Sequence, residues 1–96
     1  MYFVYILFNQ ETEKYYVGLT RDIKRRYYEH KNGLNFSTKY KHDVWKLVYV
    51  EIYTSRQDAV NRENKLKHHG SGMVEIKKRI KNTINTIILK TGAGER

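Results

Sequence analysis

The sequence predicts a small α+β domain, in which helices flank a three-stranded antiparallel sheet in the order β-β-α-β-α-α. Three segments, residues 2–8, 14–19 and 45–53, carry the apolar runs or the alternation that are typical of strands. In the second half of the chain, apolar residues recur at three- and four-residue steps, as in amphipathic helices. Because the 96 residues contain no repeat, linker or proline, we expect one domain over residues 1–90 and a loose tail over 91–96.

The first two strands are expected to form a hairpin. Residues 2–8 are continuously apolar, which suits a strand that is buried on both faces. The polar residues 9–13 form the loop. A register that sets Tyr5 opposite Tyr16 brings both phenols to one face, where Gly18 leaves a gap beside them.

A helix is expected after the hairpin. Thr20 is the predicted N-cap, and Asp22 lies in the first turn, where a carboxylate interacts favourably with the helix dipole. The helix runs to about Asn32. Residues 34–44 form a polar, basic loop, and residues 45–53 then alternate as the third strand.

Two more helices complete the predicted order. Ser55 with Asp58 forms an approximate capping box for a helix that ends at Gly70. The last helix begins at Ser71 or Gly72 and carries an apolar stripe. The stripe consists of Met73, Ile76, Ile80, Ile84 and Ile87.

The charge of the chain indicates its class of partner. Lys and Arg number 19 against 10 Asp and Glu, which gives a formal net charge of +9. Such a charge on a small domain attracts polyanions, and nucleic acid is the commonest of these in a cytoplasm. Simple solubility, or docking on an acidic protein or lipid surface, also fits the charge. Nine tyrosines add rings that can stack on bases or bond to phosphates.

Several classes of protein are excluded by the composition. There is no cysteine, so neither a disulfide framework nor a thiolate metal site is available. No apolar run approaches the length of a membrane span, and no cleavable leader is recognisable, so we expect a cytoplasmic protein. A monomer is the expected state, although the last helix has apolar surface that would suit a dimer interface. That surface consists of Ile84, Ile87, Ile88 and Leu89.

Basic residues gather on the first predicted helix. Arg26 and His30 are four residues apart and therefore share one helical face. Arg26 borders the apolar stripe, so its guanidinium can reach inward toward a phosphate, whereas Arg25 carries solvated charge. By spacing alone, a solvated basic face and a Tyr5–Tyr16 pair that only packs are the simpler interpretations.

Glu63 is the most informative residue of the second predicted helix. Ala59, Glu63 and Leu66 share one helical face, so the carboxylate lies in the apolar stripe and needs a partner. An ion pair with Arg26 or Arg62 would satisfy it, and so would a hard divalent cation.

Taken in order, these residues resemble the GIY-YIG nuclease domain in its compact, single-domain form. Val4-Tyr5-Ile6 matches the first half-motif, with valine in place of the usual glycine, and Tyr16-Val17-Gly18 matches the second. The stretches GLTRDIKRRYYEH, WKLVYVE and AVNRENKLK follow in family order, the last with the pair Arg62-Glu63. The resemblance covers residues 2–80.

The resemblance implies a metal-dependent endonuclease that hydrolyses phosphodiester bonds in DNA. Glu63 would be the ligand of a single Mg²⁺ or Mn²⁺ ion, and Arg26 would hold the scissile phosphate. Tyr5 or Tyr16 would take the proton from the attacking water, with Tyr5 favoured by family analogy. His30 would orient a phenol or bind a phosphate.

The remaining implied contacts are to the nucleic-acid backbone. Gly18 leaves room for a ligand, Arg25 adds charge, and Lys39 and Lys41 in the basic loop would follow the phosphates. The polar residue that some members contribute near the C-terminus has only Asn82 as a candidate counterpart.

Two other interpretations share the same charge. The main alternative is a basic nucleic-acid-binding module with little or no cleavage activity, and the other is a small RNA-binding protein without a metal. An inward Glu63 favours the nuclease, because a carboxylate beside a phosphate is unfavourable without a cation. The pattern leaves open whether the DNA is single- or double-stranded and whether RNA also binds.

Overall fold

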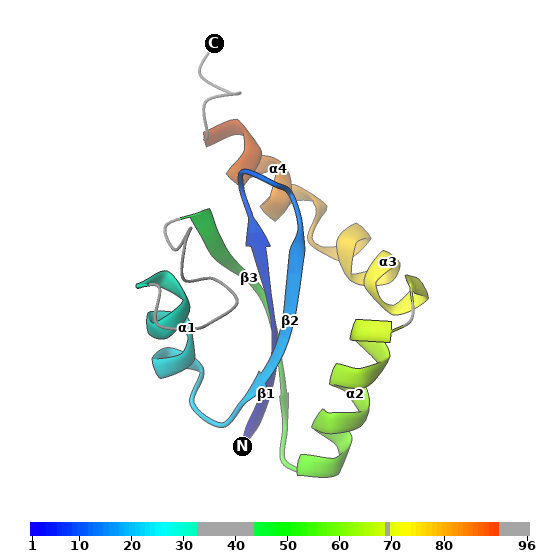
Figure 1. The fold of residues 1–96 in the computed structure, drawn as a ribbon. Coiled ribbons are helices and arrows are strands. Elements are labelled where there is room, and N and C mark those ends of the chain that lie inside the picture. The colour runs from blue at the N-terminus through cyan, green and yellow to red at the C-terminus, as the bar shows by residue number, and fades with distance from the viewer. Residues whose placement is uncertain (33–43, 69, 91–96) are drawn as a thin grey trace.

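A three-stranded antiparallel sheet separates one helix on one face from three helices on the other (Figure 1). The computed structural model describes residues 1–32, 44–68 and 70–90. The predicted α+β class and the order β-β-α-β-α-α are confirmed, with the last predicted helix divided into two. None of the described helices has both the length and the apolar character needed to span a lipid bilayer.

The most buried strand lies in the middle of the sheet. β1 (Tyr2–Asn9) pairs on one side with β2 (Tyr15–Thr20) and on the other with β3 (Trp45–Tyr53), so the strand order is β2-β1-β3. Residues 4–9 of β1 are all buried because helices cover both faces of the sheet. This agrees with the unbroken apolar run in the sequence, which is typical of a strand that is buried on both faces.

The predicted register of the hairpin is wrong by two residues. Tyr5 pairs with Gly18 rather than with Tyr16, which lies opposite Leu7. Because side chains alternate along a strand, a shift of two residues keeps Tyr5 and Tyr16 on one face. The shift closes the hairpin through Asn9, whose side-chain oxygen accepts hydrogen bonds from two backbone N–H groups of the loop at 2.8 and 2.9 Å.

The first helix begins two residues later than predicted. Asp22, not Thr20, is the N-cap of α1 (Ile23–Lys31), because its carboxylate accepts a hydrogen bond from the backbone N–H of Arg25 at 3.0 Å. Thr20 instead ends β2, and its hydroxyl accepts the backbone N–H of Asp22 at 3.0 Å. Thr20 therefore holds the turn that leads from the sheet into the helix.

The remaining helices depart from prediction at their junctions. α2 (Arg56–His68) begins after Ser55, as expected, but the predicted end at Gly70 is wrong, because Gly70 is the first residue of α3 (Gly70–Arg79). α4 (Lys81–Lys90) follows α3 after a single residue.

The break between α3 and α4 leaves the apolar stripe continuous. Ile80 lies between the two helices, yet its backbone N–H donates to the carbonyl of Ile76, and Ile84 donates to that of Ile80, both at 3.0 Å. The interruption therefore preserves the helical spacing that brings these residues to one side.

The main apolar core lies on the face of the sheet that α2, α3 and α4 cover. Side chains of all three helices pack there against alternate residues of β1. The predicted stripe is thus a core face, and of the residues considered for a dimer interface only Leu89 is strongly exposed, at 61%. The buried residues of this core are Val4, Ile6, Phe8, Ala59, Leu66, Ile76, Ile80 and Ile84.

Replacing Ile76 by alanine should lower the free energy of unfolding by about 2–5 kcal/mol, because it leaves a cavity in this core. Ile76 is 2% exposed, whereas Val74 on the same helix is 50% exposed. Val74→Ala is therefore the matched control and should change stability by less than about 0.5 kcal/mol. Urea unfolding followed by circular dichroism measures both values, and equal losses in the two variants would contradict this description of the core.

Candidate active site

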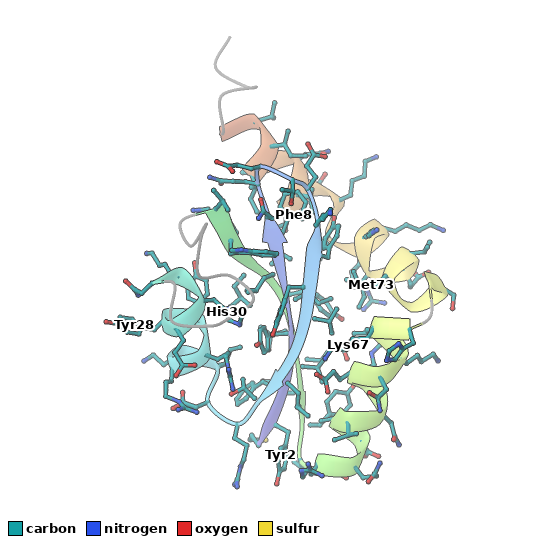
Figure 2. All side chains as sticks on the ribbon, viewed as in Figure 1. Tyr2, Phe8, Tyr28, His30, Lys67 and Met73 are labelled. Carbon is teal, nitrogen blue, oxygen red and sulfur yellow. The ribbon has the colours of Figure 1, made fainter. Side chains whose placement is uncertain are left out.

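Three aromatic rings meet on the face of the sheet that α1 covers. The ring centroids of Tyr5 and Tyr16 are 6.3 Å apart, and the imidazole of His30 lies 5.8 Å from the first and 5.0 Å from the second. The Tyr5 hydroxyl and His30 Nε2 form a buried hydrogen bond of 3.1 Å. Figure 2 shows His30 between α1 and the sheet, whereas Tyr28 of the same helix points away from the protein. The structure thus brings together three of the predicted site residues.

The phenol of Tyr5 lies directly over the backbone of Gly18. A Cβ atom at position 18 would overlap the ring and hydroxyl of Tyr5. Gly18 is therefore needed for the close approach of the phenol, which is one of the recurrent uses of glycine within a strand. The gap that the sequence predicts at Gly18 is filled by Tyr5 itself.

Burial keeps the Tyr5–His30 pair uncharged near neutral pH. Tyr5 is 2% exposed, and this burial raises its pKa well above the ordinary value. Tyr16 raises the pKa of Tyr5 further, through its charge and a hydrogen bond, while the charge of Arg26 opposes the shift. Burial and the nearby Arg26 cation lower the pKa of His30. A protonated phenol therefore faces a neutral imidazole.

Arg26 has an unsatisfied donor beside this aromatic cluster. Its Nη1 lies 3.6 Å from a carboxylate oxygen of Glu29, but its Nε is buried without a hydrogen-bond partner among the described residues. A buried N–H without a partner costs free energy, which an anion bound at the site would recover. Arg25, by contrast, is exposed and pairs with Asp22 and Glu29 at 3.9 and 3.6 Å.

Glu63 belongs to α2, the helix on the opposite side of the sheet from α1. Its side chain is 17% exposed and pairs with Lys67 at 2.9 Å, rather than with Arg26 or Arg62. The charge of Glu63 helps to raise the pKa of Tyr5, so the carboxylate lies within electrostatic range of the phenol. Figure 2 shows Lys67 beside the sheet on the side of α2.

Glu63 offers one carboxylate to a divalent ion. Within the described parts of the chain, no three His, Cys, Asp or Glu side chains form a group that could hold a metal. One inward carboxylate nevertheless suits Mg²⁺, which binds through one or two carboxylates and keeps several waters. The Lys67 ammonium beside Glu63 shows that this position accepts a positive charge.

A second polar cluster was not anticipated from the sequence. Arg62 donates two hydrogen bonds to Glu51, at 2.8 and 2.9 Å, and the hydroxyls of Tyr49 and Tyr53 donate to the same carboxylate at 2.9 and 2.7 Å. Burial alone would raise the pKa of Glu51, but these hydrogen bonds outweigh it and hold that pKa below its ordinary value. Burial and the bond to Glu51 raise the pKa of Tyr53 to about 12.

The spacing in β3 contained a signal for this cluster. Tyr49, Glu51 and Tyr53 are two residues apart and therefore share one face of the strand. What the spacing does not contain is the approach of Arg62 from α2. Because Arg62 is occupied here, it is not available as the ion-pair partner of Glu63.

Three further residues of the predicted site are Lys39, Lys41 and Asn82. Lys39 and Lys41 lie outside the described residues. Asn82 is exposed on α4, where its backbone carbonyl accepts a hydrogen bond from the Thr86 hydroxyl at 2.9 Å.

Comparisons with known proteins agree with the resemblance seen in the sequence. The family described as the GIY-YIG catalytic domain matches residues 1–73. A UPF0213 protein from Limosilactobacillus reuteri (strain DSM 20016) is 32% identical over 69 residues, which cover 70% of this chain and 71% of that protein. No solved structure matches the chain significantly.

Replacing Glu51 by glutamine should lower the free energy of unfolding by about 1–3 kcal/mol at neutral pH, because Arg62 loses its charged partner. The lowered pKa of Glu51 gives stability that is complete above the ordinary value of 4.5 and is lost as the pH falls through the folded-state pKa. The gap in stability between wild type and variant should therefore narrow in acid.

Urea unfolding of both proteins between about pH 7 and pH 3 measures this gap. Glu75→Gln, which removes a carboxylate from an exposed position on α3, is the control and should track the wild type throughout. A gap for Glu51→Gln that stays constant down to pH 3 would contradict the assigned role.

Proposed function

Because the chain belongs to the GIY-YIG family, we propose that it is a metal-dependent endonuclease that hydrolyses phosphodiester bonds in DNA. The family supports a nuclease-type function. The observation that carries the finer proposal is the meeting of three site rings from β1, β2 and α1 beside Arg26, whose buried Nε lacks a partner. The net charge of +9 fits a polyanionic substrate.

Arg26 would bind the scissile phosphate. A guanidinium donates directional, charge-assisted hydrogen bonds to phosphate oxygens, and its positive charge would stabilise the negative charge that develops in the transition state. The unpaired Nε would then gain the hydrogen bond that it lacks among the described residues. Its Nη1 keeps a long contact to Glu29 at 3.6 Å, which would hold the side chain in place.

Glu63 would hold the divalent cation, Mg²⁺ or Mn²⁺. When bound, that ion would supply positive charge to stabilise the leaving oxygen. Lys67 would release Glu63 at that moment, and its partly exposed side chain is able to move into solvent. The electrostatic link between Glu63 and Tyr5 supports placing both at one reaction centre.

Tyr16 is our choice for the phenol that faces the attacking water. Tyr5 is almost completely buried, whereas Tyr16 is only partly buried and can meet a substrate. A phenol is a weak base at neutral pH unless its own proton can leave. The hydrogen bonds between Tyr16 and Tyr5 and between Tyr5 and His30 would offer a route for that proton once their donors and acceptors are suitably oriented.

The proposed proton route runs from water through Tyr16 and Tyr5 to His30. Water gives a proton to the Tyr16 oxygen while the Tyr16 proton moves to Tyr5 and the Tyr5 proton moves to Nε2 of His30. The resulting hydroxide attacks phosphorus, the bond to the leaving oxygen breaks, and solvent protonates the departing alkoxide. The lowered pKa of His30 keeps its imidazole neutral and ready to accept the proton near pH 7.

A cleavage assay tests the proposed activity directly. Labelled single- and double-stranded DNA and RNA are incubated with Mg²⁺, with Mn²⁺ or with EDTA. We expect cleavage of DNA only with metal, and a loss of about 100-fold or more in Glu63→Gln, because the carboxylate ligand is removed. Glu75→Gln, an exposed carboxylate on α3, is the matched control and should cleave like the wild type.

Each contrary outcome has a clear meaning. Metal-independent cleavage, or full activity in Glu63→Gln, would contradict the mechanism. Binding without cleavage on every substrate would favour the alternative of a nucleic-acid-binding module.

Conservative variants of the tyrosines test the proton route. Tyr16→Phe should lower the single-turnover rate by about 100- to 10,000-fold, because it removes the proposed base. Tyr15→Phe is the control, since Tyr15 packs against the core on the opposite face. His30→Gln should lower the rate, because it removes the final proton acceptor, and the residual rate should lack the fall that protonation of His30 causes at acid pH in the wild type. Activity retained in Tyr16→Phe but lost in Tyr5→Phe would transfer the role of base to Tyr5.

A further inference from the structure

A pocket rich in arginine lies beside the proposed catalytic centre. Its volume is about 340 Å³, and its walls come from the beginning of β1, the end of β2 and the beginnings of α1 and α2. Four of its lining residues are arginines, at positions 21, 25, 26 and 56, and none is acidic. We propose that this pocket binds a phosphate of the DNA backbone next to the scissile one; this inference rests on the proposed function for the identity of the ligand.

Two of the four arginines have no acidic partner. Within the described part of the chain, no carboxylate lies within 4 Å of the guanidinium groups of Arg21 and Arg56, whereas Arg25 and Arg26 both contact Glu29. Arg21 instead lies over the ring of Tyr2, 5.1 Å from its centroid. Stacking on an aromatic ring restricts a guanidinium while leaving its N–H donors available to an anion.

Arg26 connects this pocket with the catalytic centre. Its side chain lines the pocket, and its charge also shifts the pKa values of Tyr5 and His30. A strand whose scissile phosphate contacts Arg26 would therefore carry its neighbouring phosphate toward Arg21 and Arg56. Contacts of this kind fix the position of the strand without reading its sequence.

A second basic pocket, at the opposite end of β2, is the weaker candidate. It is lined by Lys14, Lys67 and Lys77, but also by the acidic Glu13. Lys67 is paired with Glu63, and Lys77 lies 4.8 Å from the centroid of the Tyr15 ring. Two of its three lysines therefore already have partners, which favours the arginine pocket as the phosphate site.

Substitution at Arg56 is suitable for a test because the fold does not depend on it. Arg56 is exposed and is the first residue of α2, where the helix dipole favours a negative rather than a positive charge. Arg56→Gln should therefore remain folded. Arg79→Gln is the matched control, since it removes the same charge from an exposed position near the end of α3, outside the pocket.

Binding without cleavage measures the contribution of the pocket. Fluorescence anisotropy with labelled single- and double-stranded DNA oligonucleotides is recorded in EDTA over a range of salt concentrations. Arg56→Gln should weaken binding by about 3- to 10-fold and reduce the slope of log K against log salt by about 0.7–0.9, because one phosphate contact is lost. Arg21→Gln/Arg56→Gln should roughly double the change in slope, Arg56→Lys should retain most of the affinity, and Arg79→Gln should bind like the wild type.

The outcomes separate this inference from the proposed activity. Equal effects of Arg56→Gln and Arg79→Gln on DNA affinity and salt slope would overturn the proposal that the pocket binds a phosphate. This holds even if the wild type cleaves DNA in a metal-dependent manner. A selective loss of binding in Arg56→Gln would support the pocket, even if no cleavage is found. With cleavage, Arg56→Gln should raise KM and leave kcat nearly unchanged.

Discussion

The close approach of the Tyr5 phenol to the backbone of Gly18 is the constraint on which the candidate site depends. Any larger residue at position 18 would overlap the ring of Tyr5. The Tyr5 side chain can therefore take this position only because β1 and β2 pair with Gly18 opposite Tyr5. With Tyr5 in place, its hydroxyl reaches His30 and its ring lies beside Tyr16. The aromatic cluster is therefore a consequence of hairpin register as much as of α1 packing.

Much of the fold follows from local pattern, and the errors occur where several arrangements fit the same pattern. The third strand has its predicted bounds because residues 45–53 combine alternation with aromatic and β-branched residues. The hairpin register differs by two residues, because such a shift keeps Tyr5 and Tyr16 on the same face, and periodicity cannot distinguish the two. The N-cap of α1 is Asp22 rather than the predicted Thr20, because both residue types suit an N-cap and the sequence does not distinguish them.

In the site, too, features set by spacing along one element could be predicted from the sequence, whereas features set by packing between elements could not. The shared face of Tyr5 and Tyr16 and the inward position of Glu63 could be deduced from spacing alone. The partner of Glu63 could not, because Lys67 and Arg62 are both within reach on α2, and only the position of β3 commits Arg62 to Glu51. Arg56 in the basic pocket was missed for a related reason, since it meets the other three arginines only through the tertiary arrangement of α1 and α2 around the sheet.

The distribution of charge links these features to one mechanism. The buried centre holds groups that are neutral near pH 7, the Tyr5 phenol and the His30 imidazole, so it carries no net charge before a proton is transferred. The permanently charged groups, Arg26 and the other arginines of the pocket, lie at the margin of this centre. An arrangement of this kind separates the binding of a polyanion from proton transfer. Under the proposed function, a change in pocket charge should therefore alter how tightly DNA is held, whereas a change among the buried rings should alter how fast it is cut.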